Sequence, residues 1–312
     1  TSNGLGNAQI VEAVKDGRIP EEFLDKMVDN VLTVIMKSKE VLGDYTYDKD
    51  AHHQKAREIA GQCMVLMKND NNALPVKKDA KIALIGEMAR TPRYQGAGSS
   101  LINPIKLDSA YDTLKEMGAD FTFAAGYTLK GKNKKANEMV AEAVNNAKNA
   151  DVALVFVGLT DDYETEGNDR SHINLPPIHN TLVEEVLKVN PNTIVVLSGG
   201  ASVTMPWADK VPAILNMFLT GQAGGSAVCD IIFGDVNPSG KLAETYPIAL
   251  EDNSSYNFFP GTSVSVEYRE GVYVGYKYYD TANKEVAFPF GFGLSYTTFE
   301  YSDIKLSADS IK

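Results

Sequence analysis

Short β-rich runs alternate with helical stretches through the middle of the chain, and this alternation limits the folds that it can adopt. The β-rich runs are mostly apolar and cover residues 81–86, 121–125, 152–157, 193–197 and 213–218. Between them lie predicted helices at about 108–117, 134–148, 178–189 and 222–233. Continuous apolar strands separated by helices are typical of a parallel sheet with both faces covered. The sequence therefore predicts an α/β body that ends near residue 245.

The chain on either side of this body has a different character. Residues 20–40 carry apolar side chains at a 3.6-residue period, which predicts an amphipathic helix with Pro20 in its first turn, and a second helix is expected at 52–68. Beyond Pro247, aromatic and turn-rich sequence predicts an extended segment that wraps the body. The stretch 298–306 alternates at period two like a strand but has no partner strand after it. We therefore expect that the chain lacks neighbouring parts at both ends.

Composition narrows the classes of partner. A net charge of −11 argues against nucleic acid, which usually requires a basic face. No apolar run reaches the roughly 18 to 20 residues that span a membrane, and the first residues lack the regions of a signal peptide. The four histidines form no metal-binding pattern, so no metal site is indicated. Cys63 and Cys229 are expected to be buried free thiols, and scarce cysteine slightly favours a cytoplasmic bacterial enzyme over a secreted one.

The candidate chemistry lies in an acidic loop, residues 163–170, directly after the third β-rich run. In an open α/β sheet, ligands bind beyond the carboxyl ends of the strands, where this loop is expected. Glu164 and Glu166 are two residues apart, so in an extended loop their side chains can point the same way. Asp169 and Arg170 can pair and brace the loop. A carboxyl that stays protonated at neutral pH can act as a general acid, whereas the alternative is a solvated acidic loop without a catalytic role.

A second candidate is the glycine-rich stretch 93–100, which follows the first β-rich run. It resembles a phosphate-binding loop, but the dinucleotide fingerprint GxGxxG and the Gly-Lys-Ser/Thr motif are both absent. Its small residues predict a tight turn beside a site, with Arg93 and Gln95 as hydrogen-bond donors to a polar ligand. No serine lies in a nucleophile elbow, GxSxG, so serine-hydrolase chemistry is not indicated.

Several motifs, taken in order along the chain, resemble those of the glycoside hydrolase family 3 β-glucosidases. They are residues 68–75, 95–100, 164–170 with Leu175-Pro176, 234–242 and 290–297. The resemblance implies a TIM-type barrel with an aspartate nucleophile, then a six-stranded, mostly parallel α/β sandwich with the acid/base, and then a fibronectin-type β domain. For this chain it implies barrel helices at 1–43, the sandwich domain at 44–247, its wrapping segment at 248–296, and the first strand of the β domain at 297–312.

By this resemblance Glu166 is the acid/base, and Glu164 is its alternate. The residue before the Asp-Arg pair is often aromatic in the family, whereas here it is Asn168. The family's Ser-Asp-Trp nucleophile segment is absent, since the only tryptophan, Trp207, follows Met205-Pro206. A retaining glycosidase needs two carboxyl groups about 5 to 5.5 Å apart. The chain is therefore expected to hold half of an active site, which a barrel from missing sequence or from a second chain completes.

The function that the resemblance implies is retaining hydrolysis of terminal non-reducing β-D-glucosyl residues in cello-oligosaccharides and aryl glucosides, without a metal or organic cofactor. Other activities of the family stay open: β-xylosidase, exo-glucanase or N-acetylglucosaminidase, the last disfavoured by the acidic loop. A different class also stays open, a non-catalytic α/β domain that binds carbohydrate or acts as a scaffold between domains. Sugar binding that ignores Glu166→Gln would favour that class.

Overall fold

The computed structural model describes residues 6–131, 135–308 and 310. It divides into two compact units, Thr1–Asp48 and Lys49–Lys312. The strands of the described chain all belong to the second unit, so the predicted α/β body lies there.

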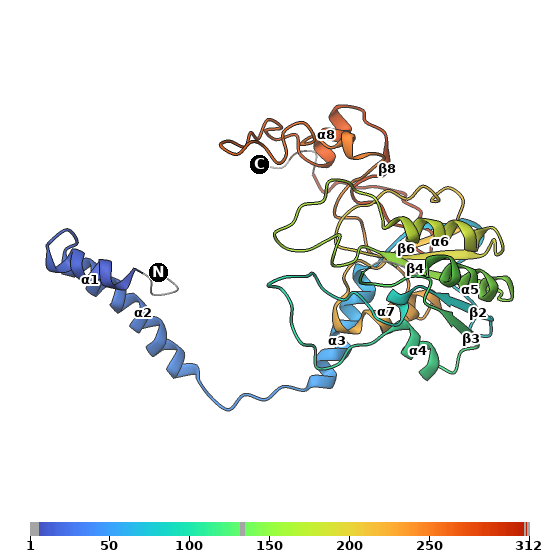
Figure 1. Ribbon diagram of the computed structural model, residues 1–312, viewed down its shortest axis with the longest axis horizontal. Coiled ribbons are helices and arrows are strands. Elements are labelled where there is room, and N and C mark those ends of the chain that lie inside the picture. Colours follow the sequence, from blue (N-terminus) through green and yellow to red (C-terminus); the bar gives the residue numbers. More distant parts are fainter. Residues whose placement is uncertain (1–5, 132–134, 309, 311–312) are drawn as a thin grey trace. The chain divides into compact units, whose positions relative to one another are not determined.

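The first unit is helical. It contains α1 (Asn7–Lys15) and α2 (Glu21–Val41), coloured dark blue and blue in Figure 1. Pro20 precedes α2, and Glu21 and Glu22 lie in its first turn, where their negative charge interacts favourably with the helix dipole. None of the residues of α2 is buried, and its large apolar side chains are exposed except that of Leu24, which is half-buried. The helix expected at 20–40 is therefore present, with an apolar face that its own unit leaves uncovered.

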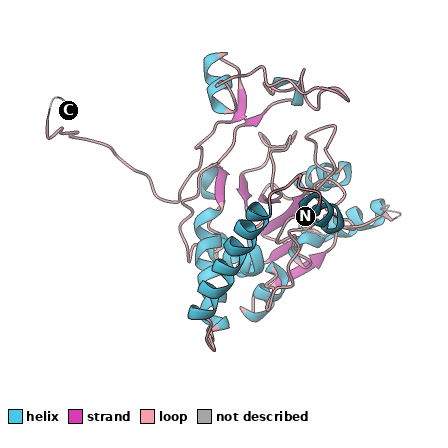
Figure 2. Ribbon diagram, turned by 90° about the vertical axis from the view of Figure 1, so that its left-hand side faces the viewer, coloured by secondary structure: helices cyan, strands magenta, loops and turns pink. Residues whose placement is uncertain are grey.

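The second unit is built on a six-stranded sheet in the order β1-β6-β5-β4-β2-β3, drawn in magenta in Figure 2. Its strands are β1 (Val65–Asn69), β2 (Ile82–Ile85), β3 (Phe121–Ala124), β4 (Val152–Gly158), β5 (Thr193–Ser198) and β6 (Ala213–Asn216). Neighbouring strands run parallel except β1, which pairs antiparallel with β6. Every residue of β2, β4, β5 and β6 is buried, as expected when both faces are covered. The predicted mostly parallel α/β sheet is confirmed.

Helices cover this sheet at the predicted spacing. They are α3 (Lys49–Cys63), α4 (Ala110–Glu116), α5 (Ala136–Lys148), α6 (Pro177–Leu187) and α7 (Gly224–Ile232), with 3₁₀ turns η1 (Asp70–Asn72), η2 (Glu87–Ala89) and η3 (Gly221–Ala223). Helix α7 packs against α3 and α4, whereas α5 packs against α6. The Ser109 hydroxyl caps α4 by accepting a hydrogen bond from the Asp112 N–H at 3.0 Å. Within the described ranges, none of the helices has the length and apolar character needed to cross a membrane.

The helix expected at 52–68 is wrong beyond Cys63. Helix α3 ends at that residue, and the next four residues, Met64 to Met67, are buried as the chain enters β1. A short apolar run fits a buried helix as well as a buried strand, and periodicity alone does not separate the two. The pairing of β1 with β6, far along the chain, decides the outcome.

The two cysteines are both free, but they differ in burial. Cys229 is buried in α7, and burial raises the pKa of its thiol to about 12. Cys63 is exposed at the last position of α3, so the expected buried thiol is wrong there. The turn into β1 directs Met64 into the core and leaves Cys63 facing solvent. In the ranges that the structure describes, no group of three or more His, Cys, Asp or Glu could hold a metal ion.

After α7 the chain forms a second sheet of two strands. Strands β7 (Tyr246–Pro247) and β8 (Val286–Phe288) pair antiparallel, with η4 (Leu250–Asp252) and α8 (Tyr276–Thr281) between them. Further on, Leu294 bridges to β1 by donating its N–H to the Leu66 carbonyl at 2.8 Å. The described residues of 298–306 form no strand, because no neighbouring strand satisfies their backbone groups. A β domain that starts there, and the four-part division of the chain, stay predictions.

Candidate active site

Three loops meet at the carboxyl edge of the sheet. Strands β2, β4 and β5 run parallel, so the loops that follow them start on the same side of the sheet. Arg93 in the first loop contacts Glu164 in the second, and Gly200 in the third contacts Glu164 as well. The acidic loop therefore lies at the sheet edge where a ligand site was expected.

Glu164 is anchored at the base of the acidic loop. The Arg93 side chain, which is 6% exposed, forms an ion pair with the Glu164 carboxylate and donates a hydrogen bond to the Glu164 carbonyl at 2.7 Å. The Gly200 N–H donates to the same carboxylate at 2.9 Å. Arg93 also donates to the Leu159 carbonyl at 3.0 Å. These contacts fasten the three loops to one another.

Glu166 lies at the exposed tip of the same loop. Its Oε2 accepts hydrogen bonds from the Ser99 hydroxyl and from the Ser99 N–H, the latter at 2.7 Å. A bridge between Thr165 and Asn168 closes the turn that carries it. The hydroxyl and then the N–H of Ser99 favour the ionised carboxylate, so they lower the pKa of Glu166. Glu166 is thus oriented by a neighbouring loop but remains accessible.

The turn that presents Ser99 depends on the glycine before it. Gly98 has a φ of +97°, a conformation that residues with a side chain rarely adopt. A Cβ built at Gly98 would also lie 2.6 Å from the Glu166 Cβ. Ser99 is a residue that the sequence reasoning missed as a partner of Glu166. A signal was present, because its loop follows β2, and β2 is the parallel neighbour of β4.

The two expected substrate donors, Arg93 and Gln95, have partners within the protein. The buried Arg93 side chain binds Glu164 and the Leu159 carbonyl. The Gln95 amide donates to the Tyr94 hydroxyl at 2.9 Å and to the Ile102 carbonyl at 3.0 Å, and it accepts from the Ile102 N–H at 3.1 Å. Gln95 therefore closes its own loop. Direct contact of Arg93 or Gln95 with a sugar stays a prediction.

The far end of the acidic loop differs from the expected Asp169–Arg170 pair. No ion pair joins these two residues in the described chain, and the buried Nη1 atom of Arg170 has no hydrogen-bond partner there. Burial raises the pKa of the Glu244 carboxyl, opposed by a hydrogen bond from the Ser202 backbone and by the charge of Arg170. Bracing by Asp169 and Arg170 stays a prediction.

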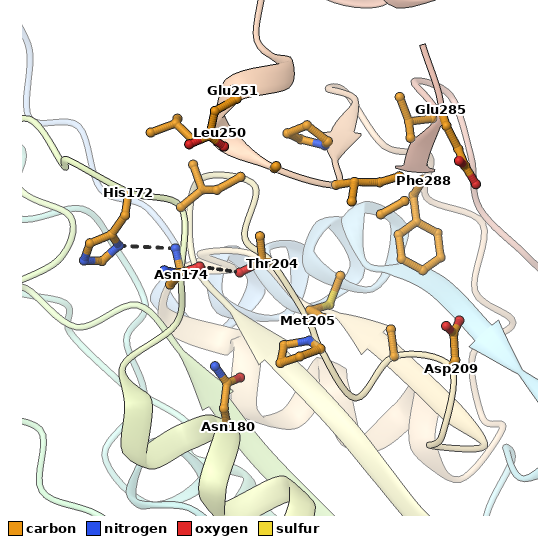
Figure 3. Close-up of a pocket in the computed structure, with 18 of the residues that line it drawn as sticks. His172, Asn174, Asn180, Thr204, Met205, Asp209, Leu250, Glu251, Glu285 and Phe288 are labelled. Atoms are coloured by element: carbon orange, nitrogen blue, oxygen red, sulfur yellow. Dashed lines mark hydrogen bonds between the residues drawn. The ribbon is translucent and has the colours of Figure 1, made fainter. Parts of the chain in front are cut away.

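A large cavity of about 870 Å³ lies beside this edge (Figure 3). It is lined by the residues that follow the acidic loop, by the loop after β5 and by the chain around β7 and β8. Inside it, the Thr204 hydroxyl donates to the Asn174 side chain at 2.7 Å, and the Asn174 N–H donates to His172 at 3.2 Å. Neither Glu164 nor Glu166 lines this cavity, so its size does not make it the site of the chemistry.

A smaller cavity of about 230 Å³ lies closer to the candidate carboxylates. Its walls include Arg93, Tyr94 and Gln95, together with Gly96 and Leu101 from the turn that presents Ser99. Arg93 also binds Glu164, whereas neither Ser99 nor Glu166 lines this cavity. The candidate site is therefore the exposed Glu166 carboxylate, with a small, partly apolar cavity beside Arg93 at the base of its loop.

One protein family and several known enzymes are similar to this chain. The model for the "Glycosyl hydrolase family 3 C-terminal domain" matches residues 64–296. The chain is 49% identical over its whole length to thermostable β-glucosidase B of Acetivibrio thermocellus, of which it covers 42%. It is also 45% identical, over 96% of its length, to an exo-α-(1→6)-L-arabinopyranosidase of Bifidobacterium breve, of which it covers 41%.

A solved structure has the same arrangement of strands and helices. The GH3 β-glucosidase of Bifidobacterium adolescentis aligns with a TM-score of 0.87 and 48% identity, over 93% of this chain and 43% of that one. The chain thus spans less than half the length of these relatives. The family match includes Ser99 and the acidic loop, and it covers more than half of the chain. The chain therefore belongs to glycosyl hydrolase family 3, and residues 64–296 form the C-terminal domain of that family.

Proposed function

We propose that this chain supplies the acid/base half of a retaining β-glucosidase, which removes terminal non-reducing β-D-glucosyl residues from cello-oligosaccharides and aryl glucosides. The β-glucosidases of A. thermocellus and B. adolescentis, at 49% and 48% identity, support this reaction. The observation that carries the proposal is the difference between two carboxylates of one loop, Glu164 anchored at its base and Glu166 presented at its tip.

Glu166 is the acid/base in this proposal, and Glu164 is the alternate. The carboxyl that protonates a departing oxygen must come within hydrogen-bonding distance of it. The Glu164 carboxylate already binds Arg93 and the Gly200 N–H at the base of the loop. Glu166 is exposed, and no hydrogen bond in the described chain uses its second oxygen, Oε1. The tip is therefore the part of the loop that can reach a sugar.

The proposed reaction has two displacement steps and retains the anomeric configuration. In the first step, the Glu166 proton passes to the glycosidic oxygen while a barrel aspartate forms an ester with the anomeric carbon, and the aglycone leaves. In the second step, the Glu166 carboxylate takes a proton from water, and the water oxygen displaces the aspartate. The steps balance without a metal or an organic cofactor.

The first step needs a protonated Glu166, whereas Ser99 lowers the pKa of this carboxyl in the chain. A barrel that packs over the tip would exclude water and bring its own aspartate close. Both effects raise the pKa of a carboxyl group. The proposal therefore assigns control of the Glu166 proton to the barrel, which comes from missing sequence or from a second chain.

Glucose is the proposed sugar because two relatives are named as β-glucosidases. The B. breve relative, at 45% identity, is named for L-arabinopyranose, which is a pentose. Similar identity over this region therefore accompanies different sugars, which supports selection of the sugar by the barrel. Arabinopyranosidase, β-xylosidase and exo-glucanase activities are the alternatives within the family.

The test uses the full-length parent protein with 2,4-dinitrophenyl β-D-glucoside, whose leaving group departs with little protonation. Glu166→Ala should slow hydrolysis by roughly 10²- to 10⁴-fold, because the attacking water loses its general base. Azide needs no general base, so it should restore turnover and yield the β-glucosyl azide. Recovery of that product, identified by NMR, would support both the role of Glu166 and retention of configuration.

The matched control is Asp162→Asn, which changes an exposed carboxylate directly before the acidic loop and should keep the wild-type rate. A wild-type rate in Glu166→Ala would contradict the assignment, and azide rescue of Glu164→Ala instead would move the role to the alternate. This chain alone should not hydrolyse the substrate, because the nucleophile is proposed to lie on the barrel. Cellobiose binding by the chain that ignores Glu166→Gln would favour the scaffold alternative.

A further inference from the structure

Residues 96–102 form the turn that presents Ser99 to Glu166, and few packing contacts support this turn. The large apolar side chains of Leu101 and Ile102 are exposed. Two residues of the turn also line the cavity of about 230 Å³, so the turn is not packed solidly against the protein. Segments with few buried apolar contacts open at a low cost in free energy. Hydrogen bonds must therefore hold Ser99 in its place.

The side-chain amide of Gln95 closes this turn. Its Oε1 accepts a hydrogen bond from the Ile102 N–H at 3.1 Å, and its Nε2 donates to the Ile102 carbonyl at 3.0 Å. Both backbone groups of Ile102 are thus paired, as a neighbouring strand would pair them. The Nε2 atom also donates to the Tyr94 hydroxyl at 2.9 Å, and this hydroxyl donates to the Ile102 carbonyl at 3.1 Å. Three of these four hydrogen bonds join the two ends of the turn.

The two ends of the turn differ in how they are held. At the first end, the Tyr94 carbonyl accepts a hydrogen bond from the Gly221 N–H at 2.9 Å, and the preceding Arg93 is anchored at the base of the acidic loop. At the second end, Ile102 is exposed, and its backbone groups are paired with Gln95. Gln95 therefore fixes the second end of the turn relative to the first.

We propose that Gln95 is a positioning residue for Glu166, acting through Ser99. Gln95 keeps the turn closed, and the closed turn presents the hydroxyl and the N–H of Ser99 to one oxygen of the Glu166 carboxylate. Both amide hydrogens of Gln95 are used within its loop, so this role differs from that of a donor to the sugar. It rests on the proposed function of Glu166 as the acid/base.

Loss of the Gln95 amide would release the second end of the turn. The backbone of Ile102 would then bind water, and Ser99 would no longer be held opposite Glu166. Because a misplacement of about 1 Å can slow an enzyme roughly 100-fold, the chemical steps should slow when Glu166 loses its orientation. Ser99 also favours the ionised carboxylate, so the pKa of Glu166 should rise toward 4.5.

The first measurement determines kcat and KM of the full-length enzyme with p-nitrophenyl β-D-glucoside. Gln95→Met keeps the length of the side chain but lacks the amide, and it should lower kcat roughly tenfold with KM within about twofold of wild type. The basic limb of kcat/KM should move to higher pH, because the acid keeps its proton longer. Tyr94→Phe removes one hydroxyl of the same network and should lower kcat less. Gln54→Met, at an exposed position of α3, is the matched control.

The second measurement is an NMR titration of the Glu166 carboxyl in this chain. Gln95→Met should raise the pKa of Glu166 at least as far as Ser99→Ala does, because it releases both the hydroxyl and the N–H of Ser99. The double variant Gln95→Met, Ser99→Ala should match Gln95→Met in this pKa and in kcat, since both changes act on one contact. Additive effects of the two changes would overturn the proposal.

Two further results would also overturn it. One is a wild-type kcat in Gln95→Met. The other is a raised KM in Gln95→Met with an unchanged pKa of Glu166, which is the result expected of a direct donor to the sugar. If circular dichroism shows that Gln95→Met does not fold, Tyr94→Phe decides the question. A wild-type kcat and a wild-type pKa of Glu166 in Tyr94→Phe would then refute the positioning role.

The Glu166→Ala variant separates this inference from the proposed function. If Glu166→Ala keeps the wild-type rate, the proposed function fails, and the positioning role fails with it. If Glu166→Ala is slow and is rescued by azide while Gln95→Met has a wild-type kcat, only the positioning role fails.

Discussion

The base and the tip of the acidic loop are built in opposite ways. At the base, the buried Arg93 pairs with Glu164 and joins three loops. At the tip, two residues further on, Glu166 is exposed, and its described hydrogen bonds come from Ser99. The chain thus determines where the loop lies, whereas the protonation of the tip depends on what covers it.

The largest expected effect is a loss of stability when Arg93 at the base is replaced. Arg93→Ala removes the partner of a carboxylate that is 22% exposed, and it leaves Glu164 facing the Gly200 N–H alone. Breaking such a pair from one side should lower the free energy of unfolding by about 3 kcal/mol. Urea denaturation of this chain, followed by circular dichroism, measures the change. The control is Lys188→Ala, which removes an exposed ion pair with Glu185 and should cost less than about 0.5 kcal/mol.

If Arg93→Ala and Lys188→Ala lowered the free energy of unfolding equally, the distinction between base and tip would be contradicted. Glu166→Gln tests the same distinction at the tip. Because the Glu166 carboxylate is exposed, its loss should change the free energy of unfolding little. A loss in Glu166→Gln as large as that in Arg93→Ala would show that the tip is also a structural element.

The second largest expected effect is a loss of stability in acid, which the buried His179 causes. This histidine contacts Gly158, the last residue of β4 before the acidic loop. Its Nδ1 accepts a hydrogen bond from the Gly158 N–H at 3.2 Å, and its ring lies 3.9 Å from that of Tyr127. Burial lowers the pKa of His179 from 6.5 to about 3. Between these values the unfolded chain binds more protons than the folded chain, so stability falls as the pH falls. The expected loss between about pH 6.5 and pH 4.5 is about 2 kcal/mol.

Urea denaturation at a series of pH values measures this dependence. His179→Gln keeps a hydrogen-bond acceptor for Gly158 but does not titrate, so its pH dependence should be flatter. His52→Gln, at an exposed position of α3, is the control and should keep the wild-type slope. A wild-type slope in His179→Gln would assign the acid sensitivity to the carboxylates instead.

The smallest effect is expected from Ser99→Ala at the tip. The Ser99 hydroxyl is the main cause of the lowered pKa of Glu166, so its removal should raise that pKa toward 4.5. The free energy of unfolding should change by less than about 0.5 kcal/mol, because the contact is exposed. NMR titration of the Glu166 carboxyl in this chain measures the shift, with Ser100→Ala as the control. An unchanged pKa in Ser99→Ala would mean that the Ser99 N–H alone orients Glu166.

Much of the sheet could be predicted from sequence because its strands are buried on both faces. The runs at β2, β4 and β5 are apolar throughout, and the helices between them keep a 3.6-residue pattern. Strand β1 could not be separated from the preceding helix, because its conformation depends on pairing with β6. The exposure of Cys63 has the same cause. The sequence predicted a helix that continues to residue 68, with Cys63 on its buried face, whereas α3 ends at Cys63.

The acidic loop could be placed from sequence, but its division of roles could not. The spacing of Glu164 and Glu166 predicts that both can face one side, yet only one of them meets Arg93. That pairing joins residues 71 positions apart, and the sequence alone offered Arg93 as a ligand donor.

The bridge between Leu294 and Leu66 has a consequence for the protein outside its active site. Strand β1 is the last strand on its side of the sheet, and β6 satisfies its backbone on one side only. Leu294 covers part of the other side, and a Cβ built at Gly293 would lie 2.3 Å from the Gly240 carbonyl, so this crossing is tight. Uncovered edge strands recruit strands from other molecules and promote aggregation. The chain after β8 therefore covers an edge that could cause aggregation. A protein cut before residue 290 would expose the free edge of β1 and should aggregate more readily.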